Sequence, residues 1–141
     1  DVVQNEDLAL EAGFRYQSLH DVLAASDFVS LHVPLLPTTG HLIDAQALAC
    51  VKPGAILVNT SRGGIVDTAA LKEALATGRL RGAGLDVLED ERTVYHDFGD
   101  LNVVVTPHLG WYTMEARDRI MRISLDNVRA WMAGRPINLI A

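Results

Sequence analysis

The 141-residue sequence contains one cysteine, Cys50, so no disulfide can form within the chain. It lacks any apolar run approaching the about 20 residues that a transmembrane helix needs. Its start does not resemble a secretory signal peptide. From these absences we expect a cytoplasmic protein that binds no membrane and keeps Cys50 as a buried, inert thiol.

The sequence has fewer basic than acidic residues, with 12 Lys and Arg and 18 Asp and Glu, so the net charge is -6. A nucleic-acid-binding surface is usually basic, so we expect no nucleic acid partner. With 49% hydrophobic and 21% charged residues, the composition is typical of a globular protein. A chain of this length fits one domain and can bury roughly two thirds of its unfolded surface.

Four short apolar runs rich in Val, Ile and Leu predict β-strands, at residues 28–33, 55–59, 83–88 and 103–106. The runs are continuous, which is typical of strands buried on both faces. Helices are expected after four N-capping residues, Ser18, Asp44, Asp67 and Thr113. Strands that alternate with helices predict an α/β fold, in which helices cover a parallel sheet.

The longest expected helix follows Thr113 and ends before Gly134 and Pro136. Its apolar residues recur with helical spacing, and we expect this stripe to pack in the core. The stripe consists of Met114, Met121, Leu125, Val128 and Met132. The polar residues 90–100 are expected to form a surface loop.

Polar side chains follow each predicted strand. The first run ends in His32-Val33-Pro34 and the second in Ser61-Arg62-Gly63-Gly64, the third passes through Asp86 into Glu89-Asp90-Glu91, and the fourth stops at Pro107-His108. In an open parallel sheet, ligands bind beyond the carboxyl ends of the strands. We therefore expect an arginine, a histidine and acidic side chains to converge on one edge of the sheet.

Three of these residues suit chemistry on a keto acid. The Arg62 guanidinium can bind a carboxylate through two parallel hydrogen bonds, or it can form a structural ion pair. His108 changes charge near neutral pH and can donate a proton, or it can bond only to backbone. Glu91 can hold the His108 tautomer and favour its protonated form, or it can be a solvated loop acid. The glycines after Arg62 allow close approach of a ligand and a backbone with positive φ.

A carboxylate-binding arginine, a proton donor and an acid beside that donor together suit the reduction of a 2-keto acid. Side chains cannot supply the hydride for this reaction. A nicotinamide cofactor is therefore required.

Four stretches carry a resemblance to a known family: LHVPLLPTTGHLI (31–43), KPGAILVNTSRGGIVDTAAL (52–71), GAGLDVLEDE (82–91) and NVVVTPHLG (102–110). In sequence and order they resemble the nucleotide-binding domain of the D-isomer-specific 2-hydroxyacid dehydrogenases. The resemblance implies a Rossmann-type doubly wound parallel sheet and NAD as the cofactor. It also implies Arg62 as the substrate-binding arginine, Glu91 as the glutamate partner and His108 as the acid/base histidine.

The resemblance implies a set of cofactor-binding residues as well. These are His32, Val33 and Pro34 on the adenosine side, and Thr60, Ser61 and Asp86 on the nicotinamide side. Asp1 is similar to the acidic residue that bonds the adenosine ribose and favours NAD over NADP, or it is a frayed terminal acid.

The sequence departs from the family in what it lacks, namely the Gly-x-Gly-x-x-Gly turn, the first strand and the substrate-side domain. We therefore expect residues 1–141 to be a partial dinucleotide-binding domain of a longer enzyme. In the strand order 3-2-1-4-5-6 the missing first strand is central. We thus expect strand 28–33 to have no neighbour, and the isolated piece to be marginally folded and inactive.

The resemblance also implies a homodimer and a small D-2-hydroxy acid as substrate. The stretches WYT (111–113) and ERTVYHD (91–97) are similar to the lactate-type branch, which favours D-lactate and pyruvate. One alternative is an NAD(H)-binding regulator similar to the transcriptional corepressors that resemble this family. Another is a dinucleotide-binding domain without chemistry. The presence of Arg62, Glu91 and His108 favours the enzyme.

Overall fold

The computed structural model describes residues 4–90 and 98–139. The chain divides into two compact units, Asp1–His108 and Leu109–Ala141. In chain order, the first unit contains α1 (Glu6–Ala12), α2 (Leu19–Ala25), β1 (Phe28–Leu31), α3 (Ala45–Cys50), β2 (Ala55–Asn59), the 3-10 helix η1 (Gly63–Ile65), α4 (Thr68–Ala76), β3 (Leu80–Leu85) and β4 (Val103–Val105). The second unit contains α5 (Met114–Met132).

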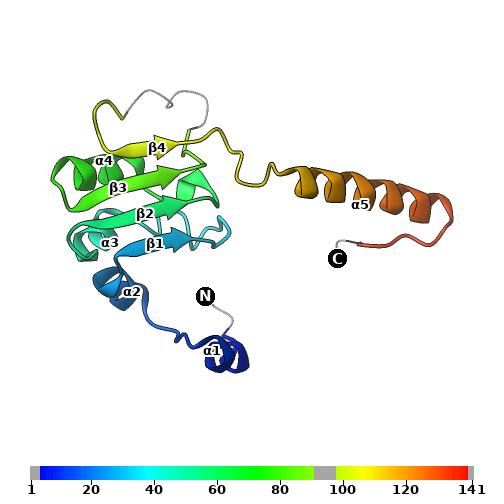
Figure 1. The fold of residues 1–141 in the computed structure, drawn as a ribbon, viewed down its shortest axis with the longest axis horizontal. Coiled ribbons are helices and arrows are strands. Elements are labelled where there is room, and N and C mark those ends of the chain that lie inside the picture. The colour runs from blue at the N-terminus through cyan, green and yellow to red at the C-terminus, as the bar shows by residue number, and fades with distance from the viewer. Residues whose placement is uncertain (1–3, 91–97, 140–141) are drawn as a thin grey trace. The chain divides into compact units, whose positions relative to one another are not determined.

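Within the described residues, four parallel strands form one sheet in the order β1-β2-β3-β4 (Figure 1). This arrangement confirms the predicted α/β fold with a parallel sheet. Each connection between neighbouring strands of β1, β2 and β3 contains a helix, as parallel pairing requires.

The prediction that strand 28–33 has no neighbour is wrong. β1 pairs with β2 along its whole length, from Phe28 opposite Ile56 to Leu31 opposite Asn59. Strands that follow one another in the sequence usually lie side by side, and the crossover through α3 brings these two together. The sheet therefore does not depend on a further strand to connect β1 with the other three.

The four predicted helices begin where expected, because the capping residue satisfies a backbone N–H of the first turn in each case, whereas α1 was not predicted. The side chains of Ser18, Asp44, Asp67 and Thr113 accept hydrogen bonds from the N–H groups three residues later, at 2.8–3.2 Å. A cap of this kind typically contributes about 1 kcal/mol. Gly78, with φ 74°, follows the end of α4 as expected.

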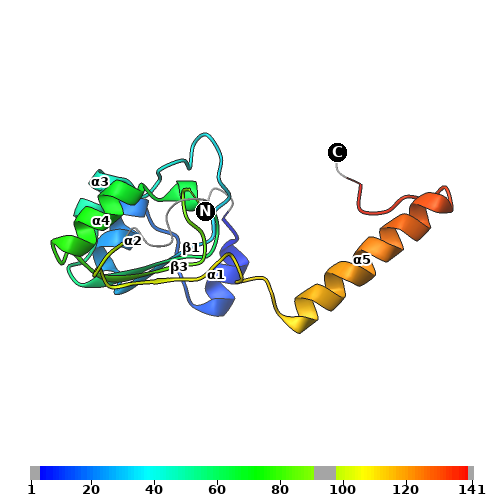
Figure 2. The ribbon, with the colours of Figure 1, turned by 90° about the horizontal axis from the view of Figure 1, so that it is seen from above.

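The core lies between the sheet and the helices α2, α3 and α4, which lie on one side of it (Figure 2). Leu23, Leu57 and Leu71 are each 1% exposed. On the opposite face of the sheet Phe28 is 72% and Val104 is 67% exposed. The prediction of strands buried on both faces is therefore wrong for the described chain, because its helices cover only one face.

Three smaller expectations also differ from the structure. Cys50 is partly exposed and not fully buried. Phe98, in the segment expected to be a surface loop, is only 7% exposed and joins the core cluster. β3 begins at Leu80, three residues before the predicted start, because Leu80 lies opposite Ala55 and extends the pairing with β2.

The apolar stripe of α5 does not pack in a core. The exposed fractions are 74% for Met114, 62% for Met121, 50% for Leu125, 54% for Val128 and 75% for Met132, and α5 has no buried residue. Helical spacing correctly predicted the helix, but the described residues of the second unit provide nothing for its apolar face to pack against. Among the described residues, no helix is both long and apolar enough to cross a membrane.

Candidate active site

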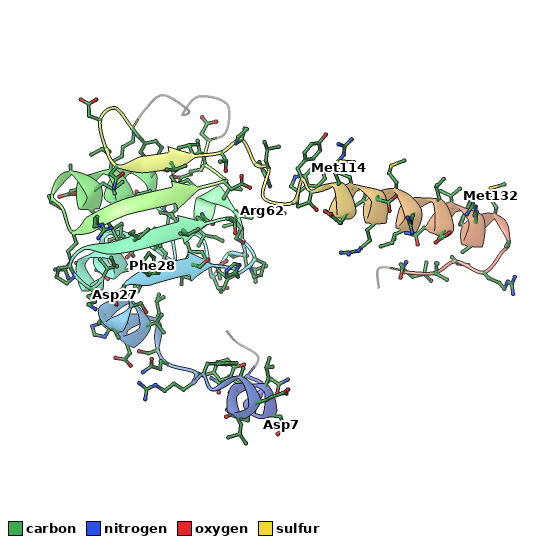
Figure 3. The ribbon with its side chains drawn as sticks, in the orientation of Figure 1. Asp7, Asp27, Phe28, Arg62, Met114 and Met132 are labelled. Carbon is green, nitrogen blue, oxygen red and sulfur yellow. The ribbon has the colours of Figure 1, made fainter. Side chains whose placement is uncertain are left out.

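The candidate site lies at the carboxyl edge of the sheet. Arg62 lies at the end to which the strands point, whereas Asp27 and Phe28 lie at the opposite end (Figure 3). Asn59 is the last residue of β2, Asp86 directly follows β3, and His108 follows β4 by three residues. The four chain segments that the sequence predicts to converge therefore end at the same edge.

Hydrogen bonds tie each strand end to the next. The Ser61 hydroxyl donates to the Val33 carbonyl oxygen at 2.5 Å, across the ends of β1 and β2. The Asp86 N–H donates to the Asn59 carbonyl oxygen at 2.9 Å, and the His108 N–H donates to the Asp86 carbonyl oxygen at 2.8 Å. These bonds fix the predicted cofactor and substrate residues relative to one another.

Arg62 is exposed, and its backbone is extended, with φ -142° and ψ 138°. Its Nη1 donates a hydrogen bond to the carbonyl oxygen of Ser61 at 2.7 Å. In the part of the chain that the structure describes, no acidic side chain forms an ion pair with Arg62. The guanidinium is thus accessible to an anionic ligand at this edge.

Asp86 and His108 follow β3 and β4 at the same edge of the sheet. Asp86 is 6% exposed, and one of its carboxylate oxygens accepts a hydrogen bond from the Thr106 hydroxyl at 2.5 Å. His108 is partly buried and has a left-handed backbone with φ 55°. Non-glycine residues rarely adopt this conformation, and they often do so at functional sites.

The reason for a glycine at position 63 differs from the predicted freedom of φ. Neither Gly63 nor Gly64 has positive φ. A Cβ atom on Gly63 would lie less than 3.0 Å from backbone atoms of Leu88 and Glu89. The glycine is needed because the protein's own backbone after β3 passes against it, a contact that no local sequence pattern indicates.

We expect Gly63→Ala to destabilise the protein by about 1–3 kcal/mol, the usual cost of overpacking. The backbone at residues 88–89 cannot yield as a flexible side chain would. Gly84→Ala is the matched control, because its Cβ would meet only Val58 side-chain atoms at ordinary contact distance. Chemical denaturation of the full polypeptide measures the difference. Equal stability of the two variants would contradict the close approach.

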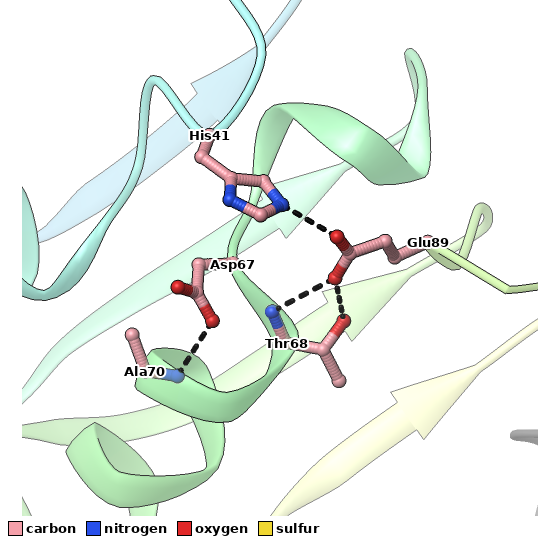
Figure 4. A network of polar contacts seen from close by, with 5 residues as sticks. All are labelled: His41, Asp67, Thr68, Ala70 and Glu89. Atoms are coloured by element: carbon pink, nitrogen blue, oxygen red, sulfur yellow. Dashed lines mark hydrogen bonds and ion pairs between the residues drawn. The ribbon is translucent and has the colours of Figure 1, made fainter.

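A second polar network lies beside η1, around Glu89 (Figure 4). One Glu89 carboxylate oxygen lies 2.5 Å from Nε2 of His41. The other accepts hydrogen bonds from the Thr68 hydroxyl at 2.9 Å and the Thr68 N–H at 3.2 Å. We call this group the His41–Glu89–Thr68 network. It joins the segment before α3, the segment after β3 and the first turn of α4.

The network shifts the pKa of both its titratable groups. The hydrogen bond with Glu89 raises the pKa of His41, with smaller electrostatic contributions from the Glu89, Asp67 and Asp44 carboxylates. Burial alone raises the pKa of Glu89, but the hydrogen bonds from His41 and Thr68 together outweigh it, so the pKa is lowered. The pair is therefore most stable with His41 protonated and Glu89 ionised.

His41→Asn is expected to lower the melting temperature most between pH 4.5 and pH 6.5, the ordinary pKa values of glutamate and histidine. The stabilisation from His41, whose pKa is raised, is complete below 6.5 and is lost as the pH rises through the raised pKa. The stabilisation from Glu89, whose pKa is lowered, is present above 4.5 and is lost as the pH falls through the lowered pKa.

His20→Asn is the control for this prediction, because His20 also lies beside a carboxylate but at 3.4 Å and on an exposed surface. Melting curves of both variants and the unsubstituted protein from pH 4 to pH 9 give the comparison. A His41→Asn effect that does not change with pH would show that the ion pair adds nothing to stability.

Comparison with known proteins shows the family of the chain. The model of the family described as D-isomer specific 2-hydroxyacid dehydrogenase, NAD binding domain, matches residues 1–110. The chain belongs to this family. The family's NAD-binding domain therefore includes all of the first unit, together with the strand ends described above.

The relatives of this chain within the dehydrogenase family are named for different substrates. The chain is 48% identical over 127 residues to D-3-phosphoglycerate dehydrogenase of Mycobacterium tuberculosis, covering 89% of the chain and 24% of that protein. It is 46% identical over 132 residues to glyoxylate reductase of Thermococcus litoralis, covering 92% of the chain and 40% of that protein. The chain thus spans less than half of the length of these relatives.

Solved structures of the family are similar in fold. D-lactate dehydrogenase of Aquifex aeolicus, solved with NAD and lactic acid, has a TM-score of 0.85 at 38% identity, over 96% of this chain and 45% of that one. D-lactate dehydrogenase of Escherichia coli, in its apo form, has a TM-score of 0.89 at 35% identity, over 98% and 44%.

The strand ends present side chains that a dinucleotide cofactor such as NAD can reach. His32, Pro34 and Thr60 are exposed at the carboxyl edge, so a dinucleotide can reach them. The hydroxyl of Ser61 joins the segment of His32 and Pro34 to that of Thr60 through the carbonyl of Val33. The residues expected on the two sides of the cofactor are thus held together.

Two predicted site residues, Asp1 and Glu91, lie outside the described residues. The sequence analysis assigned no role to Asn59 or His41, and it named Glu89 only among the acidic residues expected at this edge. Asn59 had one local signal, a polar residue that ends an apolar strand. His41 and Glu89 are 48 positions apart, and no local pattern connects them.

Proposed function

We infer that the chain provides the NAD-binding part of a dehydrogenase that interconverts a small D-2-hydroxy acid and its 2-keto acid. One observation supports this proposal: backbone hydrogen bonds join Asp86 to Asn59 and to His108, so the segments that carry Arg62, Asp86 and His108 meet at one edge of the sheet. A guanidinium and an imidazole at one edge suit a substrate with a carboxylate and a neighbouring carbonyl.

Each residue of the site has a distinct task in this proposal. Arg62 binds the substrate carboxylate and so orients the carbonyl group. His108 donates a proton to the carbonyl oxygen during reduction and accepts it back during oxidation. Glu91, outside the described residues, orients the His108 ring in this proposal. Bound NADH supplies the hydride that reduces the carbonyl carbon.

The cofactor residues complete the proposed site. Asp86 lies on the side of the nicotinamide carboxamide, Thr60 and Ser61 border the nicotinamide, and His32, Val33 and Pro34 line the adenosine side. Asp1 bonds the adenosine ribose and favours NAD. In this proposal residues 1–141 are a partial dinucleotide-binding domain, and further residues of the full polypeptide form the substrate-side domain.

The finer parts of the proposal concern substrate and assembly. We favour D-lactate and pyruvate, because residues 111–113 are similar to the lactate-type branch and D-lactate dehydrogenases are among the similar structures. Phosphoglycerate and glyoxylate, named in the relatives, share the same carboxylate and adjacent oxygen-bearing carbon. A cytoplasmic homodimer completes the proposal.

An assay of the full polypeptide tests this function. NADH oxidation is followed with pyruvate, glyoxylate, hydroxypyruvate and 3-phosphohydroxypyruvate, and the chirality of each product is determined. We expect the highest kcat/KM with pyruvate and a D-product. No oxidation with any keto acid, despite NADH binding, would contradict the enzyme and favour the regulator or the inactive domain. Light scattering during the same preparation tests the homodimer.

A further inference from the structure

Asn59 is the most buried polar residue of the candidate site. It ends β2, is 1% exposed, and lies in register with Leu31 of β1 and Leu85 of β3. A buried side-chain amide is costly unless its oxygen and nitrogen both have hydrogen-bond partners. Its partners therefore indicate why an amide is present at this position.

Both partners of the Asn59 amide belong to the turn that carries Arg62. Its Oδ1 accepts a hydrogen bond from the Ser61 N–H at 3.0 Å. Its Nδ2 donates a hydrogen bond to the Arg62 carbonyl oxygen at 3.0 Å. One side chain thus binds the backbone on both sides of the Ser61–Arg62 peptide bond.

The guanidinium is bound to the same turn. Nη1 of Arg62 donates a hydrogen bond to the carbonyl oxygen of Ser61. The N–H of Ser61 in turn donates a hydrogen bond to Oδ1 of Asn59. The three hydrogen bonds connect the Asn59 amide, the Ser61 peptide groups and the Arg62 guanidinium in one continuous set. The direction of the guanidinium therefore depends on a turn that Asn59 holds.

Asn59 also connects this turn to the nicotinamide side of the site. Its backbone carbonyl oxygen accepts the hydrogen bond from the Asp86 N–H at 2.9 Å. The side chain of Asn59 thus fixes the segment proposed to bind substrate, and its backbone fixes the segment proposed to face the cofactor. A single buried residue, Asn59, therefore sets the position of the Arg62 segment relative to the Asp86 segment.

We propose that Asn59 is a positioning residue for substrate binding, whose amide holds the Ser61–Arg62 turn so that the guanidinium meets the 2-keto acid carboxylate. This role rests on the proposed function of Arg62. Misplacement by about 1 Å is enough to weaken such an interaction strongly, because bidentate binding needs aligned donors. Asn59 itself does not touch the substrate.

Asparagine is specifically suited to this task. Aspartate has nearly the same shape but lacks the donor for the Arg62 carbonyl oxygen, and it places a carboxylate oxygen against that carbonyl. Serine is neutral and can still accept from the N–H two residues later, but it is too short to reach both partners. The two substitutions therefore remove the same hydrogen bond, with and without a buried charge.

The experiment compares Asn59→Asp and Asn59→Ser in the full polypeptide. The measurements are KM and kcat for pyruvate reduction, the Kd of the pyruvate analogue oxamate for the enzyme–NADH complex, the Kd of NADH, and the melting temperature. We expect KM and the oxamate Kd to rise roughly tenfold to a hundredfold, as for a buried group left without its hydrogen-bond partner. The NADH Kd should change by less than about threefold, because aspartate and serine can both still accept from the Ser61 N–H and so keep the segment that borders the nicotinamide in place.

Asn102→Asp is the matched control. Nδ2 of Asn102 also donates to a backbone carbonyl oxygen, that of Arg81, at 2.6 Å, but near the opposite end of the sheet. The chemical change and the type of lost hydrogen bond are the same in both variants. Asn102→Asp is expected to leave KM and the oxamate Kd unchanged.

A double substitution separates positioning from general stability. If Asn59 acts through Arg62, then adding Asn59→Asp to Arg62→Ala should raise the oxamate Kd by less than about threefold, because the group being positioned is gone. If Asn59 only stabilised the fold, Asn59→Asp would raise the oxamate Kd by the same factor with and without Arg62→Ala.

Several outcomes would overturn the proposal. These are unchanged oxamate affinity in both Asn59 variants, a parallel loss of NADH binding, a full effect in the Arg62→Ala background, and failure of both variants to give folded protein that binds NADH. An unsubstituted enzyme that neither reduces a keto acid nor binds oxamate refutes the proposed function, and the role of Asn59 with it. An active enzyme whose Asn59 variants bind oxamate normally refutes the role of Asn59 alone.

Discussion

Replacing His108 by glutamine in the full polypeptide is expected to lower kcat for 2-keto acid reduction by roughly a hundredfold to ten-thousandfold, the range of general acid catalysis. Glutamine can donate a hydrogen bond to the carbonyl oxygen, but it cannot transfer a proton at neutral pH. The backbone N–H at position 108 still reaches the Asp86 carbonyl oxygen, so the turn after β4 is retained. KM and NADH affinity should therefore change little.

Single-turnover measurements with NADH and pyruvate isolate the chemical step for this variant. His20→Gln serves as the control, because His20 is an exposed histidine on α2. Turnover close to that of the unsubstituted enzyme would remove His108 from the proton transfer. A fall in NADH affinity of the same size as the fall in kcat would instead indicate damage to the cofactor site.

Arg62→Ala is expected to raise KM for the keto acid roughly a hundredfold to ten-thousandfold. Two charge-assisted hydrogen bonds to the substrate carboxylate are lost, at about 1.5–3 kcal/mol each, where 1.4 kcal/mol corresponds to tenfold. NADH affinity should be retained, since the Arg62 side chain is exposed and, among the described residues, its guanidinium bonds only to the Ser61 carbonyl oxygen. Arg62→Lys should recover only part of the loss, because lysine keeps the charge without the planar fork.

Titration of the enzyme–NADH complex with oxamate, together with steady-state KM values, measures the effect. Arg122→Ala is the control, because Arg122 forms an exposed ion pair with Asp118 on α5 at 2.7 Å. Such surface pairs contribute little. NADH binding that weakens as much as oxamate binding would show that Arg62 does not bind the substrate carboxylate.

The sequence was sufficient where the physical cause is local. Ser18, Asp44, Asp67 and Thr113 predict helix starts, because a capping side chain acts on an N–H only three residues away. The apolar runs predict the strands, and their polar ends predict the edge at which Arg62, Asp86 and His108 gather, because parallel strands end on the same side.

Predictions failed where the cause lies in packing between distant segments. The stripe from Met114 to Met132 predicts a helix, but helical spacing says nothing about what covers it, and the described chain leaves it exposed. The glycine pair predicts freedom of φ, yet Gly63 is required by the backbone of Leu88 and Glu89. The neighbour of β1 follows from the crossover and not from the run of apolar residues.

By itself the sequence determined the order of the four strands and of the helices α2 to α5, the family, and the candidate residues Arg62 and His108, because these depend on spacing and motifs along the chain. Only the tertiary structure decided that the amide of Asn59 holds the Arg62 turn, and that His41 meets Glu89 across 48 positions. Such contacts depend on strand register and on the course of the segments beyond the strand ends, and chain folding sets both.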